Sequence, residues 1–278
     1  MSEAVLYVVA TPIGNLEDMT PRALRILESV ALIAAEDTRH SGRLLSHFNI
    51  KTPMIAVHDH NERQQQQKII EKLQRGDDIA LISDAGTPLI SDPGFVLVRE
   101  VRAAGFKVSP LPGCCALVAA LCAAGVPSDR FAFEGFPPAK SQQRLNFYTA
   151  LAAETRTLMF YESPHRIIDS LKDIVAAFGP DRQIALAREL TKTFETFLNG
   201  TAEAVLAQVE ADPNQRKGEF VLMVEGAPKQ DESLLDPRSS EVLDILLEEL
   251  SVKQASALAA KITGIKKKVM YQAALERK

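Results

Sequence analysis

The sequence IALISDAGTPLISDPG, residues 79–94, decides how the rest of the chain is interpreted. Residues 79–82 form a short apolar run, rich in β-branched side chains, which is typical of a strand buried on both faces. Two glycines and two prolines follow; they permit unusual backbone conformations and prevent the strand from continuing. Open α/β sheets bind their ligands in specified loops at the carboxyl ends of parallel strands. Residues 83–94 are therefore the first candidate for a ligand site in an α/β fold.

The charges of this loop indicate the kind of ligand. Both are negative, Asp84 and Asp92, and the chain holds neither a P-loop pattern nor a Gly-x-Gly-x-x-Gly motif for nucleotide phosphates. Such a loop repels phosphate and accepts a cation such as an ammonium or a sulfonium. The alternative is that the two aspartates only cap helices or brace turns.

Length and composition set the broad class. A chain of 278 residues exceeds a typical single domain, and an apolar fraction of 46% supplies an ordinary globular core. The net charge of −4 argues against a generally cationic nucleic-acid wrapper but leaves room for a local basic patch. The amino terminus has no basic region ahead of its apolar run, and the longest apolar run, 114–126, is too short to span a membrane. We expect a cytoplasmic protein whose three cysteines (Cys114, Cys115 and Cys122) are reduced and buried.

A repeated order of strand, polar loop and helix runs through the first half. It predicts a parallel sheet with right-handed crossovers, whose polar loops line one edge as a wide cleft. The predicted strands are 5–10, 32–35, 54–57, 79–82 and 107–111.

The second half brings a further α/β unit. Its predicted strands are 157–161, 183–187 and 220–224, its predicted helices are 165–178 and 202–210, and an apolar helix over 114–124 precedes it. We predict an N-terminal α/β domain over 1–115, a second α/β domain over 116–228, and a linker with a small helical domain over 229–278.

The C-terminal part is separated by a stretch rich in Pro, Asp, Glu and Ser over 227–240, which predicts a linker. A helix with an acidic face is predicted over 241–250, followed by a helix–turn–helix pair over 253–262 and 266–275. Residues 251–278 carry seven basic side chains and one acidic one. This asymmetry favours contact with a polyanion, although a solvated surface helix is the simpler alternative.

Eight motifs, in order along the chain, together resemble one known family. They are TPIGN at 11–15, EDTRH at 36–40, HDHNE at 58–62, SDAGTPLISDPG at 83–94, PSDRF at 127–131, YESPHR at 161–166, ARELTK at 187–192 and KGE at 217–219. The chain thus resembles the ribosomal RNA small subunit methyltransferase I family from about residue 5 to its end. The resemblance implies a tetrapyrrole-methylase-like fold, with two α/β domains, S-adenosylmethionine in the cleft between them, and a homodimer. It also implies 2′-O-methylation of a cytidine ribose in the decoding region of 16S rRNA, within the small ribosomal subunit.

The resemblance also implies a set of cofactor-binding residues. They are Pro12, Asp84, Ala85, Gly86, Thr87, Ile90, Pro112, Gly113, Cys115, Tyr161, Ala187, Arg188, Gly218 and Glu219. Two of them have simpler alternatives, since Tyr161 could be a core aromatic and Cys115 a small core hydrophobe.

The general base is less well specified. Candidates are His58, His60, Glu62 and Asp37, because imidazoles and carboxylates can accept a ribose proton. The two histidines could instead brace a loop, and their spacing also resembles that of metal ligands, although we predict no metal site. Methyl transfer to a hydroxyl can also rely on positioning alone.

RNA contacts are expected from basic side chains, namely Arg39, Lys192, Lys266, Lys267 and Lys268. Aromatic residues are only 6% of the chain, with no tryptophan, so recognition would rest on RNA shape rather than on extensive base stacking. Two other functions stay open: a tetrapyrrole methylase of the same fold, and a non-catalytic RNA-binding ribosome factor.

Overall fold

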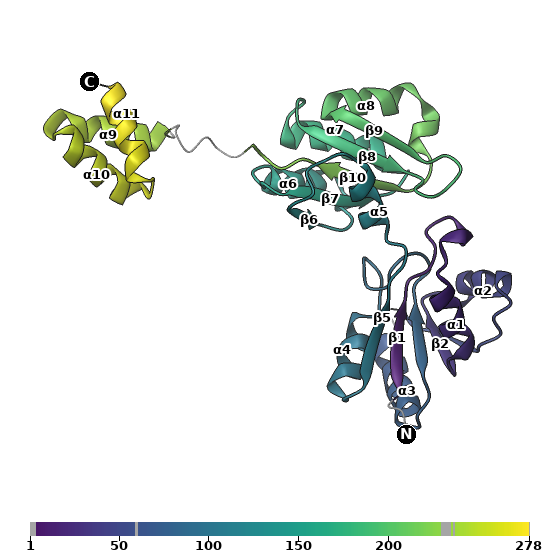
Figure 1. Ribbon diagram of the computed structural model, residues 1–278. Coiled ribbons are helices and arrows are strands. Elements are labelled where there is room, and N and C mark those ends of the chain that lie inside the picture. The colour runs from purple at the N-terminus through teal and green to yellow at the C-terminus, as the bar shows by residue number, and fades with distance from the viewer. Residues whose placement is uncertain (1–3, 59–60, 229–234, 236, 278) are drawn as a thin grey trace. The chain divides into compact units, whose positions relative to one another are not determined.

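The computed structural model describes residues 4–58, 61–228, 235 and 237–277, with no account of the Glu62 side chain. The chain divides into two compact units, Met1–Gly226 and Ala227–Lys278 (Figure 1). Each is described by itself below.

The first unit begins with the predicted parallel sheet. Its strands are β1 (Val5–Val9), β2 (Leu32–Ala35), β3 (Met54–Ala56), β4 (Ile79–Ile82) and β5 (Lys107–Leu111). Their order is β3-β2-β4-β1-β5, and every pair is parallel. The loop after β4 therefore leaves the middle of the sheet.

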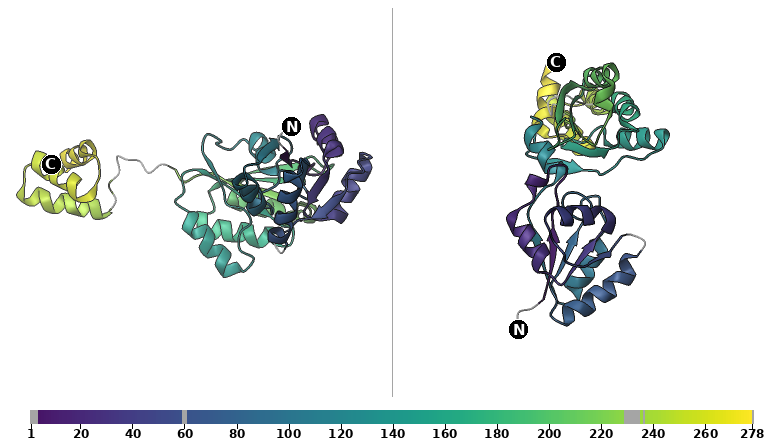
Figure 2. Two further views of the ribbon diagram at one scale, coloured as in Figure 1. Left: turned by 90° about the horizontal axis from the view of Figure 1, so that it is seen from below. Right: turned by 90° about the vertical axis from the view of Figure 1, so that its right-hand side faces the viewer.

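Helices cover both faces of this sheet (Figures 1 and 2). The core of one face takes side chains from α1 (Pro21–Ser29) and α2 (Thr38–His47), and the core of the other from α3 (Glu62–Gln74) and α4 (Phe95–Ala103). Helix α1 begins as its sequence indicates, because Thr20 accepts a hydrogen bond from the Ala23 N–H and Pro21 follows it. Helix α2 was not predicted. Its buried residues are Ser41 and Leu45, so the segment lacks a visible apolar stripe.

A second sheet follows in the same unit. Its strands are β6 (Phe131–Phe133), β7 (Thr157–Glu162), β8 (Gln183–Arg188), β9 (Thr196–Thr201) and β10 (Phe220–Val224). The order is β6-β7-β10-β8-β9; the β6–β7 pair is parallel and the other pairs are antiparallel. Neither edge strand was among the predicted strands. The three residues of β6 were not predicted as a strand, and β9 was missed because its polar residues and Gly200 hide an only partly buried strand.

The faces of the second sheet are covered unequally. Three helices pack on one face: α6 (Ser141–Leu151), α7 (Ile167–Phe178) and α8 (Ala202–Ala211). The predicted apolar helix, α5 (Ala116–Ala123), packs on the other. It joins the two sheets in sequence. One expectation is wrong here, because Cys122 is exposed while Cys114 and Cys115 are half-buried.

The second unit is a three-helix domain with its own core. Its helices are α9 (Pro237–Glu249), α10 (Val252–Thr263) and α11 (Lys267–Glu276). Gly264 ends α10 in the left-handed conformation, at φ 77°, which confirms the predicted turn. Much of the predicted linker (229–234 and 236) lies outside the described residues, and residues 237–240 belong to α9. No helix in the described ranges is long and apolar enough to cross a membrane.

Candidate active site and cofactor pocket

The loop after β4 is held in an unusual backbone conformation. Thr11 and Gly86 exchange two backbone hydrogen bonds of 2.8 and 3.0 Å, which tie the loop to the end of β1. Gly86 has a positive φ of 81°. Two nearby residues that carry side chains also have a positive φ, Leu89 at 75° and Ser91 at 68°. Left-handed conformations at such residues cost roughly 1–3 kcal/mol each and concentrate at functional sites. The surrounding fold therefore imposes the shape of this loop.

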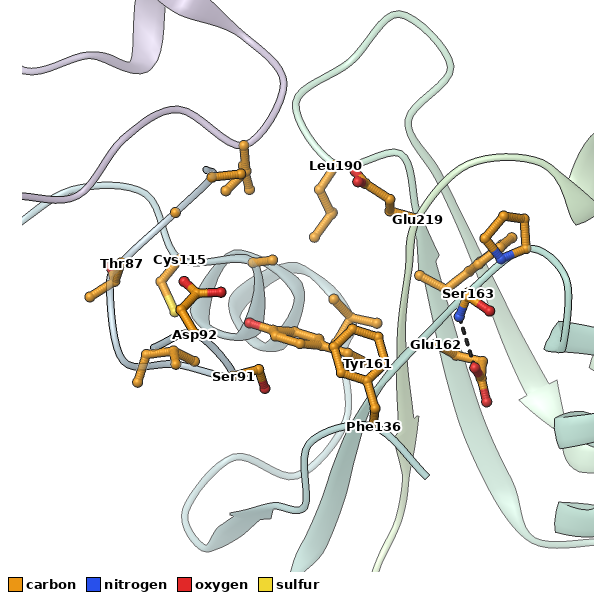
Figure 3. A pocket seen from close by; sticks show the side chains of 18 residues that line it. Thr87, Ser91, Asp92, Cys115, Phe136, Tyr161, Glu162, Ser163, Leu190 and Glu219 are labelled. Carbon is orange, nitrogen blue, oxygen red and sulfur yellow. Dashed lines mark hydrogen bonds between the residues drawn. The ribbon is translucent and has the colours of Figure 1, made fainter. Parts of the chain in front are cut away.

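A cavity of about 440 Å³ lies beside this loop (Figure 3). This is within the range of roughly 300–1,000 Å³ that small-molecule sites occupy. Its lining comes from the loops after β1, β4 and β6, the start of α5, the carboxyl ends of β7 and β8, and the start of β10. The lining residues are Ile13, Ala85, Gly86, Thr87, Ile90, Ser91, Asp92, Cys115, Ala116, Phe136, Tyr161, Glu162, Ser163, Pro164, Leu190, Glu219, Phe220 and Val221. The two α/β sheets thus contribute jointly to one pocket.

The charged side chains that line this cavity are Asp92, Glu162 and Glu219, all of them acidic. Burial raises the pKa of Asp92 to about 6, against a hydrogen bond from Ser83 that lowers it, and the charges of Glu36 and Asp84 raise it further. Glu162 is 2% exposed, and Arg166 pairs with it at 2.9 Å. Glu219 also has a cationic partner, Lys192 at 2.7 Å, so Asp92 is the carboxylate of the lining that has no ion pair among the described residues.

Tyr161 lies in the wall of the pocket, and its hydroxyl points toward the side that carries Asp92 (Figure 3). The hydroxyl oxygen accepts a hydrogen bond from the Leu117 N–H at 3.2 Å, and the ring packs edge-on against Phe133 and Phe136. Burial first, and the Cys115 thiol second, raise the pKa of Tyr161 to about 12. Tyr161 is thus a protonated wall residue that fixes α5 against the second sheet.

Half of the predicted cofactor residues meet at this cavity. Those that line it are Ala85, Gly86, Thr87, Ile90, Cys115, Tyr161 and Glu219. Pro12 and Asp84 line a separate hollow on the other side of the loop. Pro112 and Gly113 lie just before α5 and do not line the cavity, and Ala187 is fully buried in the core of the second sheet.

Arg188 and Gly218 have structural contacts. The Arg188 guanidinium donates to the Lys217 carbonyl at 2.8 Å and to the Phe194 carbonyl at 2.9 Å, so it braces the loop that precedes β10. Gly218 has φ 95°, and a Cβ there would collide with the Glu189 carboxylate. Both residues shape the cavity wall from outside it.

Lys192 joins a cluster of charges near the cavity. Its ammonium donates to Glu189 Oε1 at 2.8 Å and to Glu219 Oε2 at 2.7 Å, and its aliphatic part covers Gly14, where a Cβ would collide with it. Burial lowers the pKa of Lys192, but the two carboxylates outweigh burial and leave it raised. Glu189 and Thr191 flank it with left-handed backbone at φ 51° and φ 65°. Lys192 is thus held protonated in a strained loop next to Leu190 and Glu219 of the pocket.

Two of the predicted base candidates, Asp37 and His58, have described side chains, and both lie away from the cavity lining. Asp37 caps α2 and accepts hydrogen bonds from the Arg39 guanidinium, which hold the pKa of that carboxyl well below its usual range. His58 follows β3, and its backbone N–H donates to Asn61 Oδ1 at 2.9 Å. Glu62 begins α3, and His60 lies outside the described residues. Asp37 and His58, the candidates whose side chains the structure describes, do not line the cavity.

Several lining residues were not predicted. Ser91 and Asp92 stand in the loop that the sequence singled out, and the charge of Asp92 was the available signal. Glu162, Ser163 and Pro164 belong to the YESPHR motif, which pointed to them as a group. Phe136 and Phe220 gave no signal, because an apolar residue near a strand end looks like core.

Comparisons with known proteins now identify the family. Residues 5–206 match the family Tetrapyrrole (Corrin/Porphyrin) Methylases, and residues 234–278 match the RsmI C-terminal HTH domain. The "Ribosomal RNA small subunit methyltransferase I" of Pasteurella multocida is 56% identical over 98% of this chain and 97% of its own length. The protein of the same name from Escherichia coli O157:H7 is 56% identical, over 99% and 96%. The chain belongs to the ribosomal RNA small subunit methyltransferase I family.

Solved structures agree with this family in fold. Diphthine synthase matches with a TM-score of 0.62 at 12% identity, covering 80% of this chain and 90% of its own. Uroporphyrin-III-C-methyltransferase from Thermus thermophilus matches with a TM-score of 0.56 at 21% identity, covering 80% and 94%. These matches confirm the tetrapyrrole methylase fold predicted from the sequence. The predicted C-terminal helical domain is confirmed by its family match and by helices α9 to α11.

The methyl donor of this methyltransferase family is S-adenosylmethionine. The pocket fits it chemically, because the donor carries a sulfonium and an ammonium while the charged lining is acidic. Gly86 keeps one wall open, since a Cβ there would lie 3.3 Å from the Ile13 side chain. The volume of the cavity and its acidic lining thus both suit S-adenosylmethionine.

Proposed function

We propose that this protein methylates the 2′-hydroxyl of a cytidine ribose in 16S rRNA, in the decoding region of the small ribosomal subunit, with S-adenosylmethionine bound in the acidic cavity. The observation that supports this most is the joint cavity beneath the β4 loop, whose charged side chains are all acidic, in a chain 56% identical to rRNA methyltransferases along nearly its full length. The predicted residues that line the cavity, Ala85 to Thr87, Ile90, Cys115, Tyr161 and Glu219, are assigned to the cofactor.

When bound, the cofactor supplies an electrophilic methyl group on a sulfonium. In this proposal, the backbone of the β4 loop holds the adenosine and Asp92 neutralises the positive charge. The Lys192–Glu189–Glu219 cluster orients the ribose of the acceptor cytidine from the side of the pocket. Holding the acceptor oxygen in line with the methyl carbon accounts for much of the acceleration in such a reaction.

The ribose hydroxyl loses its proton to solvent water as the C–O bond forms and the methyl–sulfur bond breaks, so this scheme has no dedicated side-chain base. Asp37 is committed to Arg39, and Lys192 stays protonated between its two carboxylates. A protonated Lys192 can still stabilise the developing alkoxide, since a preorganised cation lowers the energy of an oxyanion. Electrostatic help and positioning together replace the histidine base that the sequence suggested.

RNA contact is assigned to the C-terminal helices and to Lys192. Lys266, Lys267 and Lys268 are exposed at the start of α11 and would contact phosphates without reading sequence. Arg39 is 90% exposed but paired with Asp37 at 2.8 Å, which reduces its value as a phosphate clamp. The homodimer remains a prediction from the family resemblance, and the cytoplasmic location remains a prediction from the cysteines and the amino-terminal sequence.

The test is a transfer assay with methyl-labelled cofactor and three acceptors: unmodified small subunits, free 16S rRNA, and a uroporphyrin. We expect label in the rRNA-containing acceptors, and 2′-O-methylcytidine after digestion to nucleosides. Label in the porphyrin alone would instead support a small-molecule methylase, and methyl on the base would refute ribose chemistry.

The variant Gly86→Val tests the assignment of the cavity to the cofactor. The positive φ at this position and the contact with Ile13 force the loop to move, so we expect cofactor binding to fall at least tenfold by calorimetry, together with transfer. Wild-type protein that gives no binding heat and no thermal shift with the cofactor would favour a non-catalytic ribosome factor.

A further inference from the structure

A second hollow, of about 240 Å³, lies in the first α/β part of the molecule and has no role in the scheme above. It is lined on one side by the loop that follows β1 and on the other by α2. The lining residues are Pro12, Gly14, Leu16, His40, Arg43, Leu44, His47 and Asp84. One guanidinium and two imidazoles thus surround a space with a single carboxylate.

Helix α2 presents two distinct faces. Ser41 and Leu45 are buried against the sheet, whereas His40, Arg43 and His47 recur every three to four residues on another face and are exposed. A segment that looked merely polar in sequence is therefore a helix with a core face and a basic face.

Arg43 is available for a ligand. Within the part of the chain that the structure describes, the Arg43 side chain forms no ion pair and no hydrogen bond. Its neighbour Arg39, by contrast, is held by Asp37 at 2.8 Å. The carboxylate of the hollow is itself engaged, because Asp84 Oδ1 accepts a hydrogen bond from the Asp37 N–H at 3.2 Å. Arg43 is therefore a better phosphate clamp than the predicted Arg39.

The hollow lies on the opposite side of a shared wall from the cofactor cavity. In the loop after β1, Ile13 faces the cavity while Pro12 and Gly14 face the hollow. In the loop after β4, Ala85 and Gly86 face the cavity while Asp84 faces the hollow. The hydrogen-bonded pair Thr11 and Gly86 joins these two loops, so the same pair of loops lines both spaces.

We propose that this hollow binds a backbone phosphate of the substrate RNA, next to the nucleotide that is methylated, with Arg43 as the main contact and His40 and His47 as additional donors. The inference rests on the proposed function, in which Lys192 contacts the RNA; the Lys192 side chain lies against Gly14, which lines the hollow. A guanidinium binds phosphate through paired hydrogen bonds, and imidazoles add donors without a large fixed charge. The acidic cavity takes the cationic donor, and the basic hollow takes the anionic backbone of the acceptor.

The test compares Arg43→Gln with Arg25→Gln, a matched exposed arginine on α1 that lines neither space. Transfer kinetics on unmodified small subunits, filter binding at several salt concentrations, and cofactor calorimetry are measured on the full-length protein. Arg43→Gln should raise the KM for the subunit about tenfold, the size of one lost charge-assisted hydrogen bond, with kcat and cofactor affinity unchanged. The slope of log K against log salt should become shallower by about 0.7, one phosphate contact on a single strand. Arg43→Lys should keep the salt slope, and Arg25→Gln should behave as wild type.

Unchanged KM and salt slope in Arg43→Gln would overturn the proposal, and so would a loss of cofactor affinity, which would mean that the hollow only supports the cofactor loop. Failure of the proposed function is distinguishable, because then wild-type protein transfers no methyl to any RNA. In that case, filter binding of the same small subunits to wild-type protein and Arg43→Gln would still show whether Arg43 contacts an RNA phosphate.

Discussion

At the scale of single residues, the position of Asp92 in the fold moves the pKa of its carboxyl group toward neutral pH. It is partly buried at the mouth of the loop, near Glu36 and Asp84, and burial is the main reason that its pKa rises to about 6. The sequence indicated an acidic loop suited to a cation. It could not indicate the raised pKa, because burial of Asp92 depends on chain segments far away in sequence, including that of Tyr161.

The raised pKa predicts a pH-dependent affinity for the methyl donor. A cation favours ionised Asp92, so cofactor affinity should rise as pH increases through about 6 and become constant above it. In the cofactor-free protein, the unfolding free energy should change with pH in the opposite direction to the cofactor affinity. Its unfolded state releases this proton first, near pH ~4, so its unfolding free energy should decrease between pH ~4 and about 6.

Calorimetry with the cofactor from pH 5 to 8, and thermal unfolding without it, measure the two effects. Asp92→Asn is the control: it should bind the cofactor more weakly at neutral pH and lose the step near pH 6. A step that persists in this variant would assign the titration to another group.

At the scale of elements, the end of β7 is fixed by a buried polar network. Glu162 Oε2 accepts from the Ser170 hydroxyl at 2.7 Å, and Ser170 lies 2.7 Å from the Tyr148 hydroxyl. Glu162 Oε1 accepts from the Ser163 N–H at 2.8 Å and pairs with Arg166 (Figure 3 shows the Ser163 bond). The network ties the cavity wall at Ser163 to α6 and α7.

Glu162→Gln is therefore expected to destabilise the fold. It removes the charge that faces Arg166 and turns one acceptor into a donor, so the free energy of unfolding should fall by about 2–3 kcal/mol. Urea denaturation measures this. The control is Glu210→Gln, because Glu210 pairs with Lys172 on the surface, at side-chain exposures of 44% and 55%, and its loss should cost under about 1 kcal/mol. Equal losses in the two variants would contradict a supporting role for the network.

The elements also show which signals a sequence carries. The strands that are buried on both faces, such as β2 and β4, have the predicted bounds, because a run of apolar residues has few other interpretations. Helix α2 and strand β9 were missed because each is mostly polar and is held by tertiary contacts. The basic hollow on α2 was missed for the same reason, since its residues come together only once the helix exists.

At the scale of the whole molecule, the chain is two units that fold around separate cores. The core of the second unit consists of its own residues, among them Leu243, Ala255, Ala259 and Met270. The cavity, in turn, is lined entirely by residues of the first unit. The charge asymmetry of the last 28 residues was visible in the sequence, and those residues belong to the second unit.

Deleting residues 227–278 should therefore separate cofactor binding from RNA recognition. The shortened protein keeps every residue that lines the cavity, so we expect its cofactor affinity by calorimetry to match that of the full chain. Its KM for small subunits should rise at least tenfold with a weaker salt dependence, since the exposed lysines 266–268 are lost with it. The full-length variant with Lys266, Lys267 and Lys268 all changed to Gln keeps the domain and should show part of the same loss. If the shortened protein methylates small subunits as efficiently as the full chain, the basic helices do not recognise RNA, and the first unit alone must do so.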